Sequence, residues 1–297
     1  MIYEIYHETK FNYVALVTFS HNIARLKPKD STTQKLLEYS LTIDPNPYES
    51  NEFVDYFENT NNFMLIREAH KSLKVIAKSR VERFENEIKK ELDSLKNIKL
   101  TLKELRERLK SYNPNDVLAK YFLFETESIP MPSMEIKKYV LESFSEDRNI
   151  IEATNEFMAR IFNDFKFVSG FSDITTPIEV IFKEKKGVCQ DFAQFAISAL
   201  RSIGIPTRYV SGYIQTLPPE GKEKLFGADA SHAWFSIYIP DFGWADFDPT
   251  NNKIPNEEYI ILGYGRDYLD ISPLKGVVQS SGNSSLGVKV NVEILTD

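Results

Sequence analysis

Short runs of apolar and aromatic residues, broken by turn residues, follow one another through the first part of the chain. The clearest run is Ser72 to Phe84, in which Leu73, Val75 and Ala77 alternate with polar side chains. Such an alternation, with a period of two, is typical of a strand that buries one face. We therefore predict that residues 1–85 form a β-rich N-terminal domain.

The hydrophobic period changes after residue 85, where leucine and isoleucine recur at three- to seven-residue steps among lysine and glutamate. This spacing predicts amphipathic helix, and the mixture of both charges indicates a solvated face rather than a binding patch. Pro130 and Pro132 then end the helical pattern. Residues 86–132 are predicted to be a helical linking segment.

The pattern after Pro132 begins with helices and ends with strands. Helices are predicted in MEIKKYVLESF and IIEATNEFMARIFNDF, and strands in TRYVSGYI, HAWFSIYI, GWADFD and LGVKVNVEIL. Separate blocks of helices and antiparallel strands are typical of the α+β class. We expect residues 133–297 to form one unit, so that an α+β chain carries a β-rich domain in front of a mixed core.

Composition and charge narrow the range of partners. Hydrophobic residues make up 42% of the chain and aromatic ones 13%, which indicates a folded globular protein. The net charge is −7 and the basic residues form no dense block, so nucleic acid is not an expected partner. Since no run approaches about 18 consecutive apolar residues, neither a membrane-spanning helix nor a membrane partner is expected.

Cysteine usage and the start of the chain bear on the compartment. The chain has one cysteine, which excludes an intramolecular disulfide. Acidic Glu4 and Glu8 interrupt the first apolar residues, so no export signal is expected. A reducing cytoplasm is therefore the predicted compartment.

That single cysteine, Cys189, lies where a helix is predicted to begin. Gly187 precedes it, and QDFAQFAISALRSIG then shows a helical apolar period. The positive end of a helix dipole favours thiolate over thiol. It can lower a cysteine pKa from about 8.5 to roughly 3.5–7.5 when an imidazolium also lies near. The free backbone N–H groups there can also hold an oxyanion. Cys189 is therefore a candidate nucleophile.

The only histidine after residue 132 is His232, which opens a predicted strand. A turn around Pro240 sends the chain back past Asp246 and Asp248. Both carboxylates fall on one face by the two-residue period, so spacing alone does not choose between them. Cysteine, histidine and aspartate in this order match a thiol–imidazole–carboxylate triad.

Each of these residues also has a structural interpretation. A buried cysteine is often a small core residue, a strand histidine is often structural, and an aspartate before Pro249 can simply cap a turn. A zinc site would need four ligands with paired short spacings, and no acidic loop with calcium-ligand spacing occurs. We therefore expect neither a metal nor a cofactor, and the joint pattern favours the triad.

Three strings around these residues carry a family resemblance: TPIEVIFKEKKGVCQDFAQFAISALRSIGIPTRYVSGYI, SHAWFSIYIPDFGWADFDPTNN and GRDYLDISPLKG. Together they resemble the bacterial transglutaminase-like superfamily, whose core is a papain-like thiol fold with the cysteine helix packed on an antiparallel sheet. FSHNIARLKPKD, LTIDPNP and DYFENTNN near the front resemble the β-rich N-terminal domain of many bacterial members. The resemblance implies a cysteine protease-like site.

Carried over position by position, the resemblance implies Cys189 as nucleophile, His232 as base and Asp248 as the orienting acid. One departure is Gln194, where many relatives have histidine. GRDYLDISP is also family-like, and Arg266 is expected to form a buried ion pair with Asp267 or Asp270.

The implied chemistry is attack of the thiolate on an amide carbonyl to give an acyl-enzyme. Water as acceptor makes the protein a cysteine peptidase or amidase, whereas an amine makes it a transglutaminase. We favour hydrolysis, because transfer needs a site that excludes water and admits an amine. The expected substrate is a peptide or protein amide, including an isopeptide or a small amide. The alternative of another class is an inactive binding protein that keeps the fold.

Overall fold

The computed structural model of the chain describes residues 1–215, 226–227 and 229–295, and its first part is made of strands. These strands are β1 (Ile2–Val17), β2 (Phe19–Ala24), β3 (Gln34–Asp44), β4 (Glu49–Val54), β5 (Thr60–Ile66) and β6 (His70–Arg83). The strand predicted at Ser72 to Phe84 is confirmed as most of β6. Its residues Leu73, Val75 and Ala77 are buried in one cluster.

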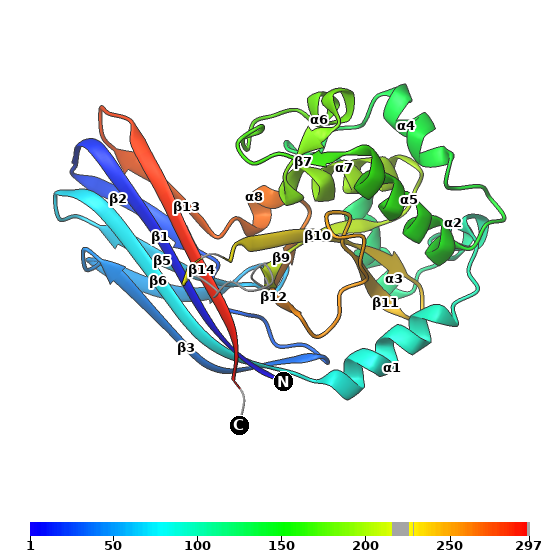
Figure 1. Ribbon diagram of the computed structural model, residues 1–297, viewed down its shortest axis with the longest axis horizontal. Coiled ribbons are helices and arrows are strands. Elements are labelled where there is room, and N and C mark those ends of the chain that lie inside the picture. The colour runs from blue at the N-terminus through cyan, green and yellow to red at the C-terminus, as the bar shows by residue number, and fades with distance from the viewer. Residues whose placement is uncertain (216–225, 228, 296–297) are drawn as a thin grey trace, which may run out of the picture.

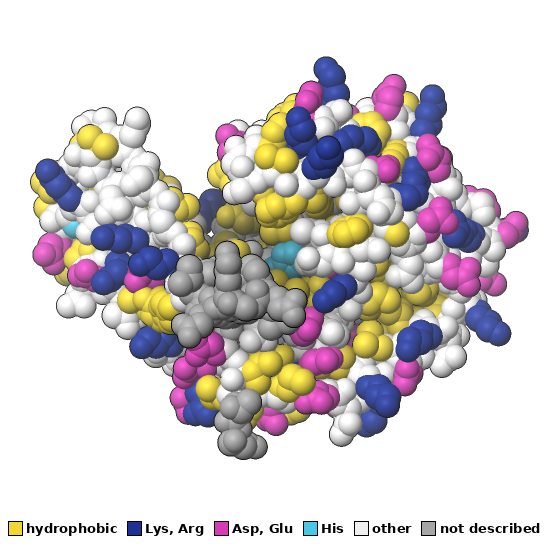
Figure 2. Space-filling model, in the orientation of Figure 1, with side chains coloured by type: hydrophobic (Ala, Val, Ile, Leu, Met, Phe, Trp, Pro, Cys, Tyr) yellow, Lys and Arg dark blue, Asp and Glu magenta, His cyan; other side chains and the backbone are white. Residues whose placement is uncertain are grey.

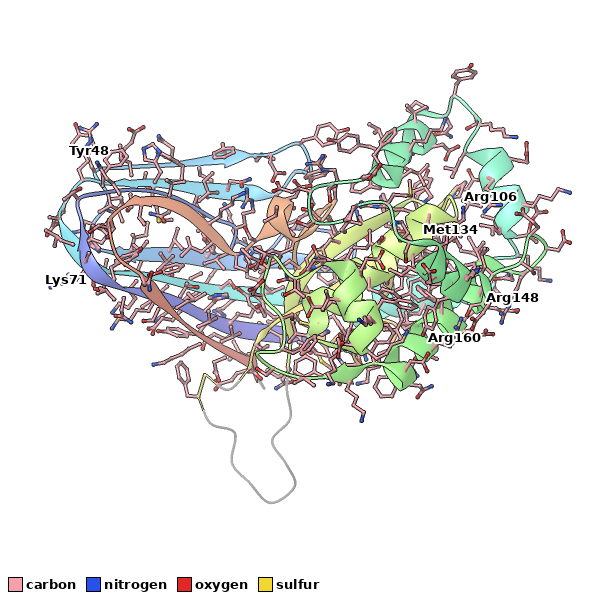
Figure 3. All side chains as sticks on the ribbon, turned by 90° about the horizontal axis from the view of Figure 1, so that it is seen from above. Tyr48, Lys71, Arg106, Met134, Arg148 and Arg160 are labelled. Carbon is pink, nitrogen blue, oxygen red and sulfur yellow. The ribbon has the colours of Figure 1, made fainter. Side chains whose placement is uncertain are left out.

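Helices follow, as the change of period predicted. They are α1 (Glu85–Lys96), α2 (Leu102–Arg108), α3 (Pro114–Ala119), the 3-10 helix η1 (Lys120–Leu123), α4 (Met134–Leu141) and α5 (Ile150–Asp164). The mixed charges of this stretch form solvated ion pairs on the surface, among them Lys90–Glu87 and Lys110–Glu107. In Figure 3, the labelled Arg106, Arg148 and Arg160 lie on this helical side of the molecule.

The rest of the chain alternates short and long elements. They are β7 (Lys166–Phe167), α6 (Ile178–Glu184), β8 (Lys186–Gly187), α7 (Cys189–Ser202), β9 (Thr207–Ile214), β10 (Ser231–Ile239), β11 (Gly243–Phe247), β12 (Tyr259–Gly265), α8 (Tyr268–Ile271), β13 (Leu274–Gln279) and β14 (Ser284–Leu295). In the described part of the chain, no helix is both long and apolar enough to cross a membrane.

Strands from the two ends of the chain share two antiparallel sheets, ordered β14-β1-β6-β3 and β13-β2-β5-β4. We call these eight strands the β-rich part, which Figure 1 shows at the left, away from most of the helices. Strand β14 pairs along β1 from Ile2 opposite Leu295 to Tyr13 opposite Ser284. The division of the chain after residues 85 and 132 stays a prediction. In the structure, β13 and β14, which that division groups with the core, pair with N-terminal strands.

A third antiparallel sheet, ordered β11-β10-β9-β12, forms the centre of the other part, and we call it the core sheet. Helix α7 packs on it, and apolar residues of both, such as Phe195 and Phe235, share the largest buried cluster. Another buried cluster joins Tyr213 and Ile260 of the core sheet to Tyr3 and Val292 of the β-rich part. Figure 2 shows that the visible face is hollowed between the two parts.

Candidate active site

Cys189 is the first residue of α7, as predicted, and its side chain is half-buried. The residue at the helix cap, Val188, has no polar side chain, and its backbone N–H donates instead to Asp191 Oδ2 at 2.7 Å. Gly187 makes room for this carboxylate, because a Cβ there would lie 2.8 Å from Asp191 Oδ2. The glycine before the cysteine thus permits the cap that fixes the start of the helix.

Asp191 is itself a buried acid that sequence reasoning missed. It is 3% exposed and also accepts a hydrogen bond from Ser172 Oγ. Burial raises the pKa of its carboxyl, while the hydrogen bonds from Ser172 and Val188 oppose that shift. The carboxylate therefore ties the loop at Ser172 to the first turn of α7, next to the thiol.

His232 is the second residue of β10 and lies opposite Gly212 of β9. A Cβ at Gly212 would lie 2.5 Å from Trp234 Cη2 and 2.1 Å from the Ile260 carbonyl oxygen. Only glycine leaves space there for the Trp234 ring, whose centroid is 6.0 Å from the centroid of the His232 ring. The glycine therefore allows the fully buried indole to support the imidazole from within the sheet.

The imidazole is held by a buried carboxylate. His232 Nε2 donates to Asp248 Oδ2 at 2.7 Å, and Asp248 is 0% exposed. The same Oδ2 accepts from Tyr259 Oη and from Asn251 Nδ2, both at 2.7 Å. Its other oxygen, Oδ1, accepts the backbone N–H groups of Thr250 at 2.9 Å and of Asn251 at 3.3 Å. Five donors thus compensate the lost hydration of one carboxylate.

Asp246, the other acid that the strand period allowed, has a different partner. Its Oδ2 accepts from the indole Nε1 of Trp234 at 3.0 Å. The structure therefore brings Asp248, and not Asp246, to the imidazole of His232.

The electrostatics of the site favour an ion pair between His232 and Asp248. Burial lowers the pKa of His232, but hydrogen bonds to Asp248 and Cys189 and the charges of both partners outweigh burial and raise the pKa to about 10. Burial raises the pKa of Asp248, but its hydrogen bond and charge contact with His232 hold that pKa below its ordinary value. Because Nε2 bonds to Asp248, Nδ1 is the nitrogen left for the sulfur. In cysteine enzymes, a cationic imidazole beside a cysteine is the setting that favours thiolate over thiol.

Two other residues that the sequence singled out make contacts around α8. The side chain of Gln194 accepts the backbone N–H of Tyr268 at 3.4 Å, so it links α7 to α8. Arg266 forms its ion pair with Asp270, with Nε 2.8 Å from Oδ2 and Nη2 3.0 Å from Oδ1, but the pair is half-buried and not buried as expected. Asp267, the alternative partner, instead caps α8, because its side chain accepts the backbone N–H groups of Leu269 and Asp270.

Sequence reasoning missed two of the residues around Asp248. Asn251 lies three positions after it, in the turn that follows the strand, so the local sequence offered a signal. Tyr259 begins β12, and strand β9 lies between β12 and β10, the strand that carries His232. The sequence pattern gave no signal for a contact between Tyr259 and Asp248. No group of three or more His, Cys, Asp or Glu side chains suited to a metal ion occurs in the part of the chain that the structure describes.

Two family models match the chain. Residues 3–82 match the bacterial transglutaminase-like N-terminal region, and residues 137–249 match the transglutaminase-like superfamily. The second match includes all three candidate triad positions. The resemblance inferred from the sequence strings is therefore confirmed.

Curated relatives and a solved structure agree with these matches. An uncharacterized protein of Mycobacterium tuberculosis is 32% identical over 295 residues, which cover 98% of this chain and 92% of the relative. A protein-glutamine gamma-glutamyltransferase of Pseudomonas aeruginosa is 35% identical over 102 residues, 32% of this chain and 15% of that protein. The crystal structure of a "putative cysteine protease" from Cytophaga hutchinsonii superposes with a TM-score of 0.75 at 20% identity, covering 100% of this chain and 92% of that one. The predicted fold class is confirmed.

Proposed function

Because the chain belongs to the transglutaminase-like superfamily, we propose that it is a thiol enzyme that transfers acyl groups from amide bonds. The nucleophile is Cys189, the proton carrier is His232, and Asp248 orients the imidazole. The observation that carries the proposal is the bond from His232 to a fully buried Asp248, beside the cysteine that begins α7. A purely structural histidine would not need a carboxylate held by five donors.

The reaction begins when the Cys189 thiolate attacks the amide carbonyl carbon. The backbone N–H of Cys189, which has no partner within the helix, can donate to the oxyanion that forms. The imidazolium then gives its proton to the leaving nitrogen, so that an amine departs and a thioester remains. In the second step His232 takes a proton from the acceptor, which attacks the thioester and restores the thiolate–imidazolium pair.

Water as the acceptor makes the enzyme a cysteine peptidase or amidase, and this is the reaction we favour. The substrate is then a peptide or protein amide, an isopeptide or a small amide. The runner-up is transfer to an amine, which the similarity to the Pseudomonas aeruginosa glutamyltransferase supports. The two reactions are distinguished by incubating the protein with a glutamine-containing peptide and a primary amine and identifying the products by mass spectrometry. Mostly free acid supports hydrolysis, whereas mostly amine adduct would show that the choice of acceptor is wrong.

Alkylation of Cys189 by iodoacetamide tests the shared chemistry, because the chain has no other cysteine. The rate is measured against pH by intact mass, for the wild type and for His232→Ala. Rapid labelling well below pH 8 that depends on His232 is the expected result. If both proteins are labelled only as an ordinary thiol is, near pH 8.5, the result would favour the alternative that the chain is an inactive binding protein with the same fold.

We also propose that the protein works in the cytoplasm, since a single free thiol is suited to a reducing compartment. Fractionation of cells followed by immunodetection tests this, and recovery of the chain from an oxidising compartment would contradict it.

A further inference from the structure

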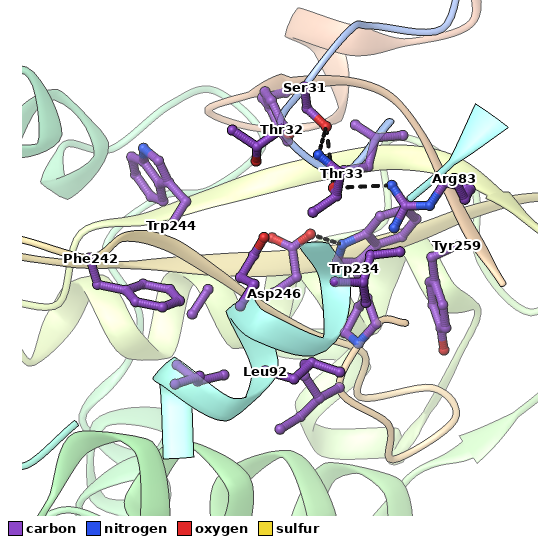
Figure 4. A pocket seen from close by; sticks show the side chains of 18 of the residues that line it. Ser31, Thr32, Thr33, Arg83, Leu92, Trp234, Phe242, Trp244, Asp246 and Tyr259 are labelled. Atoms are coloured by element: carbon purple, nitrogen blue, oxygen red, sulfur yellow. Dashed lines mark hydrogen bonds between the residues drawn. The ribbon is translucent and has the colours of Figure 1, made fainter. Parts of the chain in front are cut away.

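A cavity of about 280 Å³ lies between the core sheet and helix α1 (Figure 4). Two arginines line it, Arg83 and Arg208, and the charge of Asp246 acts on both guanidinium groups. Trp234, another lining residue, donates to the same aspartate. These groups already act on one another, so the cavity gives no reason to expect a charged ligand. The surface beside Cys189 is different, because it exposes apolar side chains.

The residues 166–174, which contain β7 and the turn after it, run alongside the start of α7, and we call them the flanking segment. Before Cys189 in the chain, the Gly187 carbonyl oxygen accepts the backbone N–H of Val168 at 2.9 Å. After it, the buried carboxylate in the first turn of α7 accepts a hydrogen bond from Ser172 Oγ. Since these two bonds lie on both sides of the cysteine, the flanking segment passes next to the thiol. In Figure 1, the connection from β7 to α6 faces the β-rich part.

The flanking segment exposes several apolar side chains close together in the chain. Phe167 is 58% exposed, Val168 is 37% exposed and Ile174 is 59% exposed. Phe171 is half-buried and packs against the large cluster that Cys189 also contacts. Soluble proteins rarely expose apolar side chains in a contiguous patch unless the patch binds something. Figure 2 shows that hydrophobic side chains also line the hollow between the two parts of the molecule.

A tight turn leaves this apolar surface open. The backbone N–H of Phe171 donates to the Val168 carbonyl oxygen at 3.2 Å, and Gly170 between them has a φ of 75°. Glycine takes this positive φ at the third position of a type II turn. A Cβ on Gly170 would meet no atom within 4 Å, so the space beside the turn is free. A substrate group can therefore approach the side chains that flank the turn.

Proton transfer decides which half of the substrate faces the flanking segment. In the proposed reaction His232 gives its proton to the leaving nitrogen, so the amine side of the scissile bond lies toward β10. The flanking segment approaches Cys189 from β8 and from the first turn of α7 instead, and the acyl side lies there. We propose that the flanking segment binds an apolar side chain on the acyl side of the scissile amide. This inference rests on the proposed thiol chemistry and adds a substrate class to it.

The geometry of an extended substrate sharpens the proposal. Successive side chains of an extended chain point to opposite faces. Of the first two residues on the acyl side, one therefore contacts the flanking segment and the other does not.

Peptidyl chloromethyl ketones test this, because the Cys189 sulfur displaces their chloride and forms a stable thioether. The reagents are the ketones of acetyl-glycylglycine, acetyl-phenylalanylglycine and acetyl-glycylphenylalanine. Labelling of the full chain is followed by intact mass, and each rate is divided by the rate of the same reagent with glutathione, which corrects for intrinsic reactivity. We expect one of the two phenylalanine reagents to react about tenfold or more faster than the diglycine reagent, and the other to react as slowly as diglycine.

Phe167→Ser should reduce this preference for phenylalanine toward one. Phe124→Ser is the matched control, because Phe124 is 63% exposed and its carbonyl oxygen accepts from Arg201 near the other end of α7. At a rise of about 1.5 Å per residue, Arg201 lies about 18 Å along the helix from Cys189. The control should keep the full preference.

Equal corrected rates for the three reagents would overturn the proposal, and so would equal acceleration by both phenylalanine reagents. These results use only the wild type, so they hold even if Phe167→Ser does not fold. A preference that survives unchanged in folded Phe167→Ser would also contradict it. Iodoacetamide has no acyl chain, so its pH profile tests the activated thiol separately. An activated thiol without preference refutes the apolar subsite alone, whereas an ordinary thiol refutes the proposed function.

Discussion

Replacing Asp248 by asparagine tests the core of the site, because the structure gives both the cost and a matched control. Three donors converge on Oδ2 and two on Oδ1. An amide has one oxygen, so its NH₂ group must face at least two of these donors. Two buried donors without acceptors cost about 1–3 kcal/mol each, which gives a destabilisation of about 2–6 kcal/mol. Asp246→Asn should cost little, since its amide oxygen can still accept the Trp234 bond.

If the proposed triad is right, the same change should also slow the reaction of the Cys189 thiol. In either orientation the amide is neutral, so it no longer stabilises a positive charge on His232. The thiol then lacks a charged partner, so its alkylation at pH 6 should be slow in Asp248→Asn and unchanged in Asp246→Asn. Denaturant unfolding and iodoacetamide labelling at pH 6 are measured for both variants. Equal behaviour of Asp248→Asn and Asp246→Asn in the two assays would refute the assignment of the orienting acid.

Three further changes have expected outcomes. Because the folded-state pKa of His232 is raised to about 10, its protonation should stabilise the fold fully below about pH 6.5 and no longer do so as pH rises through about 10. The free energy of unfolding is measured across this pH window for the wild type and for His232→Gln, and the difference between the two should shrink as pH rises. Tyr259→Phe removes one donor from the buried carboxylate and should slow labelling at pH 6, whereas Tyr213→Phe, whose hydroxyl bonds a histidine of β1, should not. Gly212→Ala should destabilise the chain by about 3 kcal/mol or more, whereas Gly287→Ala, whose nearest neighbour would lie 3.9 Å away, should unfold at nearly the wild-type denaturant concentration.

The sequence predicted the local parts of the site well, because each depends on neighbours in the chain. A glycine two positions before the cysteine, and an apolar helical period after it, placed Cys189 at the start of α7. The strand period placed His232 and both candidate acids. It could not separate Asp246 from Asp248, since residues two apart on a strand share a face. The choice depends on which acid reaches the indole of Trp234 and which reaches the imidazole, and that follows from the packing of the sheet.

The long-range parts of the fold had no such signal. The periodicity of β13 and β14 marks them as strands, but a period does not identify the partner of a strand. Their pairing with β2 and β1 returns the end of the chain to the β-rich part. The cavity between the core sheet and helix α1 could not be predicted for the same reason, because two of its lining residues, Arg83 and Arg208, lie 125 positions apart (208 − 83).

The contact between β3 and β12 suggests what the β-rich part contributes to the site. Gln34, the first residue of β3, donates its amide to the Ile261 carbonyl oxygen at 2.8 Å and accepts the Ile261 N–H at 2.8 Å. Its side chain therefore bonds to β12 as a neighbouring strand would. Ile261 lies two residues after Tyr259, which donates to Asp248 Oδ2. A side chain of the β-rich part is thus bonded to the strand that carries Tyr259, a donor to the proposed orienting acid Asp248. The hydrogen bonds around Asp248 therefore involve a strand that is bonded to the β-rich part as well as to the core sheet.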